Sequence, residues 1–257
     1  MPWFSPAPQG HSMISDRMAE VLLLLQSQDD PDDVAPIEAA ASAALGVDGL
    51  AVSLVTSDDL TELWWCAQDT SRAFEDLQLT LGEGPGLDAA RTGAMVWVPD
   101  LAKVRNDRWP LLAMEAPDTA ARAVFCFPMG IGAIRVGVLT AVRRTPGPLT
   151  PEQADDALVL ASALTARCLG RDSPHLGVMD LNDPLCTLQH AVVHQATGML
   201  SVQLSVPLPQ ALLRLRAHAY SSGRTITATS QDVVDRRLHL NPNGNGDGTP
   251  APVADKD

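Results

Sequence analysis

The chain has 257 residues, of which 46% are hydrophobic and 19% charged, and its formal net charge is −13. This length allows one large domain, or a medium and a small one, and the composition is that of a globular protein rather than a disordered or membrane one. The N-terminus lacks the features of a secretory signal, and the longest apolar run, VLLLL at 21–25, is too short to cross a bilayer. We therefore expect a cytoplasmic protein without a membrane partner.

The residues up to 170 predict one α+β domain. Hydrophobic spacing and turn signals predict the following elements in chain order: helices at 13–28 (with Ser12 as N-cap) and 29–47, strands at 49–57 and 62–68, a short helix near 86–92, a strand that ends at Pro99, strands at 123–131 and 133–144, and a helix within 146–170 that is capped by Thr150. This order is typical of an antiparallel sheet with its helices packed on one side. The domain is expected to span 13–170, after a disordered segment 1–12.

The rest of the chain predicts a small helical module. Pro174 and Gly177 interrupt the periodicity and indicate a linker over 171–182. Residues 183–240 form an all-α module with three predicted helices, at 184–204, 208–222 and 227–239. Residues 241–257 are rich in Pro, Gly, Asn and Asp, which predicts a disordered tail.

The charge is distributed unevenly between these parts. Residues 1–182 contain 12 Lys and Arg against 25 Asp and Glu, whereas residues 183–240 contain 5 against 3. A mildly basic module thus follows a strongly acidic body. The asymmetry indicates a polyanionic partner for the module, because the acidic body repels phosphates.

Several kinds of catalytic site are excluded from the larger domain. No histidine lies between His11 and His175, which leaves no imidazole there for haem, catalytic zinc or a Ser-His-Asp triad. The stretch LGEGPG lacks the context of a phosphate loop, and the four cysteines have no CxxC spacing. We expect no catalytic residue, no metal and no cofactor, although Cys66 and Cys126 leave a cysteine mechanism open.

Four side chains on predicted strands are candidates for a ligand pocket in this domain. Phe125 and Phe127 share one face of their strand, while Trp64 and Cys66 share a face of another. They are predicted to line the pocket of an unidentified small molecule. The alternative is that these residues simply form the core.

The predicted helices of the module place polar side chains around a compact core. At 100° per residue, Val192, Gln195, Ala196 and Met199 form the buried stripe of the first helix, with Leu185 and Leu188 before them. The outer face carries His190, His194, Thr197 and Ser201. Arginines and Tyr220 flank the later helices, a composition suited to phosphate contacts and base stacking, although a solvated helical face has a similar composition.

Residues 191–234, AVVHQATGMLSVQLSVPLPQALLRLRAHAYSSGRTITATSQDVV, resemble the ANTAR domain, a three-helix RNA-binding module. The similarity rests on Ala196, Gly198, Met199 and Leu200, then on Ala211, Leu215, Arg216 and Ala219, and on a third helix led by Thr227. The preceding body, with LGEGPGLDAARTGAMVWVPDL and FCFPMGI, resembles a GAF sensory domain. The combination is similar to one bacterial family of transcription antitermination regulators.

This resemblance implies a signal-responsive regulator whose ANTAR homodimer binds paired stem-loops in mRNA and prevents a terminator from forming. Five arginines are then expected to contact phosphates: Arg214, Arg216, Arg224, Arg236 and Arg237. His194 and Thr197 are expected to form hydrogen bonds, and Tyr220 to stack on a base. Gly198, inside a helix, is expected to admit an RNA backbone or partner helix, unless it serves packing within the module.

The sequence also departs from the ANTAR pattern. Thr197 stands where family members often carry Lys or Arg, Pro207 replaces a capping hydroxyl residue, and Ser230 replaces a buried alanine. Two other functions remain as alternatives: a GAF-type methionine sulfoxide reductase that acts through cysteine thiolates, and a DNA-binding regulator.

Overall fold

The computed structural model describes residues 14–27, 35–55, 61–66, 69–170, 190–241 and 246–247. Ser12, the segment 1–12, the linker 171–182 and the residues Leu185 and Leu188 lie outside these ranges. Before residue 171 the helices are α1 (Asp16–Ser27), α2 (Ala35–Leu45), α3 (Asp69–Leu81), α4 (Pro85–Thr92), the 3-10 helix η1 (Leu101–Lys103), α5 (Pro110–Glu115) and α6 (Pro151–Gly170). None of the described helices combines the length and apolarity needed to span a membrane.

Five strands form one antiparallel sheet in the order β2-β1-β5-β4-β3. The strands are β1 (Gly49–Val55), β2 (Thr61–Cys66), β3 (Val96–Val98), β4 (Ala123–Ile131) and β5 (Ile134–Arg143). The central strand, β5, pairs with β1 on one side and with β4 on the other. The predicted α+β class and antiparallel sheet are confirmed.

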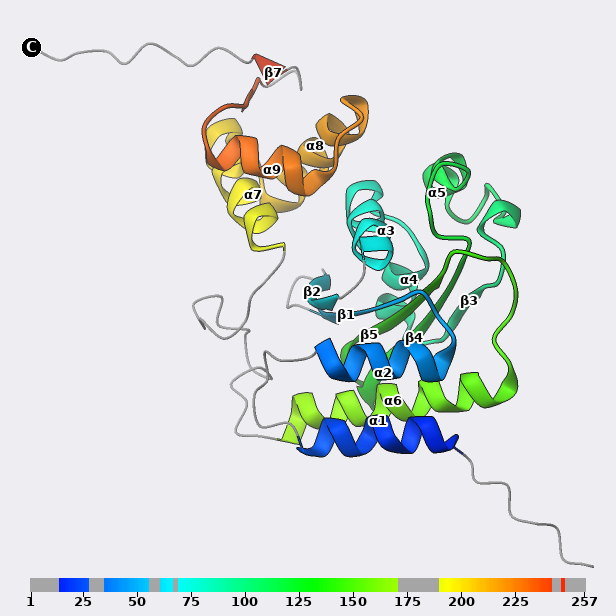
Figure 1. The fold of residues 1–257 in the computed structure, drawn as a ribbon. Coiled ribbons are helices and arrows are strands. Elements are labelled where there is room, and N and C mark those ends of the chain that lie inside the picture. Colours follow the sequence, from blue (N-terminus) through cyan, green and yellow to red (C-terminus); the bar gives the residue numbers. More distant parts are fainter. Residues whose placement is uncertain are drawn as a thin grey trace, which may run out of the picture.

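Helices cover both faces of this sheet, which corrects the prediction that they pack on one side. Helices α1, α2 and α6 lie on one face, and α3, α4 and α5 on the other (Figure 1). The reason is visible in β4, where residues 123–127 are all apolar and all buried. A strand without polar alternation has two faces to cover, and only a second layer of helices can cover the other.

Side-chain caps fix where two helices begin. The Thr150 hydroxyl accepts a hydrogen bond from Gln153 N, and Gln153 Oε1 accepts one from Thr150 N, which together form the capping box of α6. The prediction of Thr150 as N-cap is confirmed. At α1, Ser15 Oγ accepts a hydrogen bond from Met18 N, so the first helix begins three residues later than predicted.

The second part of the chain is a three-helix module of α7 (Ala191–Leu204), α8 (Leu208–Ser221) and α9 (Ile226–Val234). Its core contains Leu200, Leu215 and Val233. The third helix starts earlier than predicted because Thr225 is its N-cap, and it ends at Val234. A two-residue pairing of β6 (His239–Leu240) with β7 (Gly246–Asp247) corrects part of the predicted disordered tail.

Helix α7 is rotated by about one residue relative to its predicted orientation. Its buried residues are Val193, Ala196, Thr197 and Leu200. Gln195, predicted in the core, is exposed, while Thr197, predicted on the outer face, is buried. The rotation arises because the larger domain covers a second side of α7, which a lone three-helix module would leave to solvent.

Candidate functional site

The feature that most constrains function is the contact between the larger domain and the three-helix module (Figure 1). Helix α3, which no sequence pattern predicted, forms most of it. Asp76, Leu79 and Thr80 lie three and four positions apart and therefore share one stripe of α3. The Leu79 side chain is 7% exposed and belongs to the core of the module. A residue of the larger domain thus completes the hydrophobic core of the smaller one.

Three hydrogen bonds connect the end of α3 with the module. Arg216 Nε donates to Leu79 O over 2.8 Å, and Ile226 N donates to Thr80 Oγ1 over 3.0 Å. The Thr227 hydroxyl donates to an Asp76 carboxylate oxygen. Because the C-terminal end of a helix carries partial negative charge, it is a favourable position for the Arg216 cation.

Close approach at this point requires the glycine that follows α3. Gly82 has a φ of 71°, and a Cβ built on it would lie 3.1 Å from Arg216 Nη1. A side chain at position 82 would therefore both strain the backbone and push the guanidinium away. The stretch LGEGPG thus forms the turn after α3 and leaves room for the Arg216 guanidinium.

Strand β2 provides the second attachment, through the buried carboxylate of Glu62. Its Oε1 accepts a hydrogen bond from His190 N over 2.8 Å, and its Oε2 lies 2.7 Å from His194 Nε2. The Glu62 side chain is fully buried. A buried carboxylate needs such partners, so separation of the module from β2 would leave Glu62 to be rehydrated.

Three of the residues implied in RNA binding lie in this contact. His194 pairs with Glu62, Arg216 binds the end of α3, and Thr197 is 7% exposed with its hydroxyl donating to Val193 O over 2.7 Å. The expectation that His194 and Thr197 lie on an outer face is therefore wrong for this arrangement. We call it the closed arrangement: α7, α8 and α9 packed against β2 and α3.

The remaining arginines differ in how far they are neutralised. Arg224 pairs with Asp232 over 2.6 Å, and Arg237 pairs with Asp232 and Asp235 over 2.7 Å each. Arg236 is exposed at the end of α9, and no ion pair involves it within the described residues. Arg236 is thus the cation best placed for a phosphate.

The other two predicted RNA contacts lie on α8. Tyr220 is 36% exposed and lines a pocket of about 280 Å³ together with Arg224 and with Leu77 of α3. Arg214 is half-buried, and its Nη1 has no hydrogen-bond partner among the described residues. The structure therefore divides the nine predicted RNA-binding residues between the covered face and the open end of the module.

Gly198 has open space where a side chain would point. No atom of the described residues lies within 4 Å of an added Cβ, apart from its chain neighbours and local helix backbone. The alternative that this glycine serves packing within the module is therefore wrong in the closed arrangement. The position leaves room for a close approach from outside the described residues.

We expect Gly198→Ala to stabilise the fold but weaken RNA binding. Alanine in a helix interior is favoured over glycine by about 1 kcal/mol, and nothing obstructs its methyl group. Urea denaturation and RNA titration measure the two effects separately. Ala217→Gly, at an exposed position of α8, is the matched helix control. Unchanged RNA affinity in a stabilised Gly198→Ala variant would contradict the role in close approach.

The four predicted pocket residues do not meet around a pocket. Phe125 and Phe127 are fully buried in the core beneath α1, α2 and α6, with Trp64 packed at its edge. Cys66 lies against α3, where its Sγ is 3.2 Å from Ser71 Oγ. Trp64, Phe125 and Phe127 thus lie on the side of α1, α2 and α6, and Cys66 alone of the four lies on the side of α3, separated from them by the sheet.

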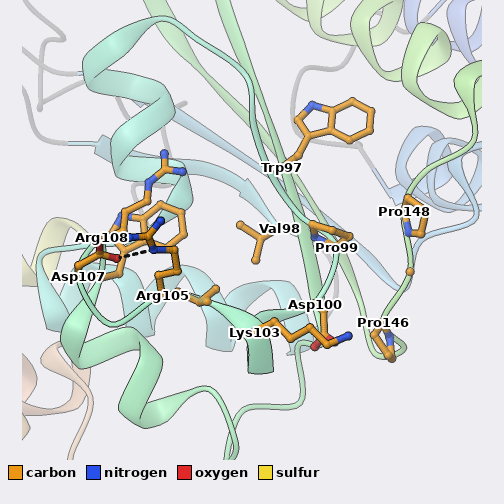
Figure 2. A pocket seen from close by; sticks show the side chains of 13 residues that line it. Trp97, Val98, Pro99, Asp100, Lys103, Arg105, Asp107, Arg108, Pro146 and Pro148 are labelled. Carbon is orange, nitrogen blue, oxygen red and sulfur yellow. Dashed lines mark hydrogen bonds and ion pairs between the residues drawn. The ribbon is translucent and has the colours of Figure 1, made fainter.

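A pocket of about 990 Å³ instead lies beside β3, η1 and the loop 146–148 (Figure 2). Its cations already have partners: Lys103 with Asp100, Arg105 with Asp107 and Arg108 with Asp88. Its charges therefore do not select a charged ligand. Among the residues that the structure describes, no group of three or more His, Cys, Asp or Glu could hold a metal ion.

A buried polar cluster lies on the sheet side of α3. Burial raises the pKa of Glu75 to about 7, against the opposing effect of hydrogen bonds with Thr140, Ser53 and Gln78. Gln78 Oε1 accepts a hydrogen bond from Gly86 N over 2.7 Å. Helix α3 thus carries a buried ionisable group one turn away from Leu79, which contacts the module.

The departures from the ANTAR pattern have visible structural effects. Pro207 precedes α8 without a side-chain cap, and the buried Ser230 hydroxyl has no partner among the described residues. Both features lower the stability of the module, because a missing cap and an unsatisfied buried hydroxyl each cost about 1 kcal/mol.

No family model matches this chain. No curated protein matches it either. Solved structures do resemble the larger domain. A GAF domain of an Acinetobacter phosphoenolpyruvate-protein phosphotransferase is 14% identical over 60% of this chain and 95% of its own, with a TM-score of 0.47. The corresponding domain from Coxiella burnetii is 16% identical over 61% and 99%, with a TM-score of 0.46.

An enzyme is also among the similar structures. The free methionine-R-sulfoxide reductase of Neisseria meningitidis is 17% identical over 58% of this chain and 84% of its own, with a TM-score of 0.43.

Proposed function

We propose that this chain is a signal-responsive, RNA-binding regulator of transcription antitermination. The larger domain is a GAF-like sensor, and residues 190–240 are an ANTAR-like module that binds paired stem-loops as a dimer. The observation that carries the proposal is the closed arrangement, in which the sensor covers His194, Thr197 and Arg216. A sensor that covers part of a binding face can control access to it.

The described geometry supports regulation rather than constant binding. RNA that uses Arg216 and His194 competes with Leu79 O and Glu62 for the same side chains. Binding of RNA and closure are then mutually exclusive, so any signal that weakens the contact favours RNA. Arg236 stays available in both states.

The first test is binding of the full chain to a labelled RNA with two adjacent stem-loops, at two salt concentrations, with duplex DNA as competitor. RNA-selective binding that weakens steeply with salt is expected, because phosphate contacts release counterions. Preference for the duplex would support the alternative of a DNA-binding regulator and contradict the proposal.

Arg236→Gln tests the open end of the module. We expect weaker binding to all stem-loop sequences alike and a salt slope smaller by about one, the signature of a single lost phosphate contact. Lys103→Gln removes an exposed positive charge from the larger domain and is the control. Equal effects of the two substitutions would mean that only net charge matters, and Arg236 would not be a contact.

The thiols argue against the reductase alternative. Burial raises the pKa of Cys66 to about 11 and that of Cys126 well above its ordinary value. A thiol nucleophile needs the opposite shift, because the thiolate is the reactive form. Thiol-dependent turnover of free methionine sulfoxide by the purified chain would overturn this view.

A further inference from the structure

A second pocket, of about 580 Å³, lies inside the closed arrangement and has walls from both parts of the chain. Thr61 of β2 and Leu79 of α3 line it on one side, and α7 and α8 on the other. Its apolar wall includes Leu79, Leu208 and Leu212, and its polar lining includes His190 and Arg216. Separation of the module would divide this pocket in two.

Arg216 is a half-buried cation without a counterion at this pocket. Its Nε donates a hydrogen bond to Leu79 O, and no carboxylate among the described residues pairs with its guanidinium. Burial lowers the pKa of Arg216, and the neighbouring charge that adds to this effect is another cation, Arg91. A guanidinium remains protonated even so, which leaves a positive charge that favours an anion.

His190 has a ring nitrogen without a hydrogen-bond partner at the same pocket. It is 6% exposed, and its Nδ1 has no partner among the described residues. The nearby carboxylate of Glu62 forms no hydrogen bond with this nitrogen; its two oxygens lie against His190 N and His194 Nε2 instead. A buried nitrogen of this kind costs free energy until a ligand supplies the partner.

We propose that this pocket binds a small amphipathic carboxylate, with its anionic group between Arg216 and His190 and its apolar part against Leu79, Leu208 and Leu212. One carboxylate matches the positive charge of Arg216, and the apolar part of the lining matches an aliphatic or aromatic body. Since the ligand contacts both parts of the chain, it stabilises the closed arrangement. Its effect on RNA binding rests on the proposed function, whereas the site itself does not.

Octanoate is the probe, and octanamide is its neutral counterpart of similar shape. Calorimetric titration of the full chain is expected to show saturable binding of octanoate, with octanamide at least tenfold weaker. Arg216→Gln should weaken octanoate at least tenfold, while Arg224→Gln, which changes an exposed arginine of the same module, should leave it within twofold. Absence of saturable octanoate binding, or equal affinity for the two probes, overturns the proposal.

A second pair of variants separates direct contact from loss of closure, since Arg216 also holds the module. Leu208 is 51% exposed and lines the pocket, so it tolerates a polar residue. Leu208→Asp should weaken octanoate about tenfold more than Leu208→Asn, because only the former adds a negative charge to the pocket that holds the anionic ligand. Equal effects of Asp and Asn would place the carboxylate elsewhere and overturn the proposal.

Different measurements test the proposed ligand site and the proposed function. Octanoate titration needs no RNA, so its outcome stands whether or not stem-loops bind. If stem-loops do bind, saturating octanoate should weaken their affinity, and octanamide at the same concentration should not. An RNA affinity unaffected by bound octanoate would leave the pocket in place but contradict its coupling to closure.

Discussion

Replacement of Leu79 by alanine is expected to raise the affinity of the full chain for stem-loop RNA about tenfold or more. The Leu79 side chain is buried in the core of the module, and truncation of a buried leucine costs about 2–5 kcal/mol. Because this leucine belongs to the larger domain, part of that cost falls on closure rather than on the fold of either part. Each 1.4 kcal/mol removed from closure makes the RNA-competent state tenfold more accessible.

The measurement is RNA titration combined with limited proteolysis between residues 170 and 190, where an opened module should be cleaved faster. Leu23→Ala, which truncates a leucine that is 65% exposed on α1, is the matched control. Circular dichroism must show that the three helices persist. Faster proteolysis without a gain in RNA affinity would contradict the prediction that the larger domain restrains the module.

Replacement of Glu75 by glutamine is expected to stabilise the protein at pH 8 but not near pH 4.5. The pKa of Glu75 is raised from 4.5 to about 7 by burial, so the folded state binds a proton more tightly than the unfolded state. The stability contributed by the protonated form is complete below about 4.5 and is lost as the pH rises through 7. The difference is on the order of 3 kcal/mol.

Glutamine remains neutral at every pH and keeps similar hydrogen-bonding atoms, so Glu75→Gln should remove this part of the pH dependence. Urea denaturation at pH 5 and pH 8 measures it, as the difference between the variant and the unaltered chain. Buried His190, whose pKa is lowered by burial, contributes a slope of opposite sign, but that slope cancels in the difference. Glu20→Gln, on the exposed side of α1, is the control. A parallel pH profile for Glu75→Gln would show that Glu75 is ionised at neutral pH.

The two predictions concern side chains one turn apart on the same helix. Leu79 faces the module, and Glu75 faces the sheet. A change in the charge of Glu75 therefore acts on the element that holds the module in place. Whether closure itself follows pH can be read from the same proteolysis assay with Glu75→Gln.

Helix α3 was missing from the sequence analysis for a clear physical reason. Its sheet-facing side buries Ser71, Glu75 and Gln78 beside Phe74, and its outward side is covered by another part of the chain. Phe74, Leu77 and Leu81 do recur at helical spacing and pack in one core cluster, so an apolar stripe is present in the sequence, but buried polar residues beside it obscure the pattern. The turn LGEGPG, which marks the end of an element before it, is a second signal.

The orientation of α7 failed for a related reason. The prediction assumed that one face packs within the module and that the opposite face meets solvent. Contact with β2 and α3 buries Thr197 and His190 in addition, and Gln195 turns outward. Hydrophobic spacing within the module does not reveal that an element distant in the sequence buries a further side of this helix.

The sequence by itself determined the α+β class, the five antiparallel strands, the cap at Thr150 and the three helices of the module, because these depend on local propensity and on patterns within a few residues. The tertiary structure alone decided that Cys66 lies apart from the other predicted pocket residues, and that His194, Thr197 and Arg216 lie at the contact with the larger domain. Those outcomes depend on pairings such as Glu62 with His194 and Leu79 with Arg216, between residues more than 100 positions apart. Such contacts are chosen by shape, burial and charge across the whole fold, and no local pattern in the chain encodes them.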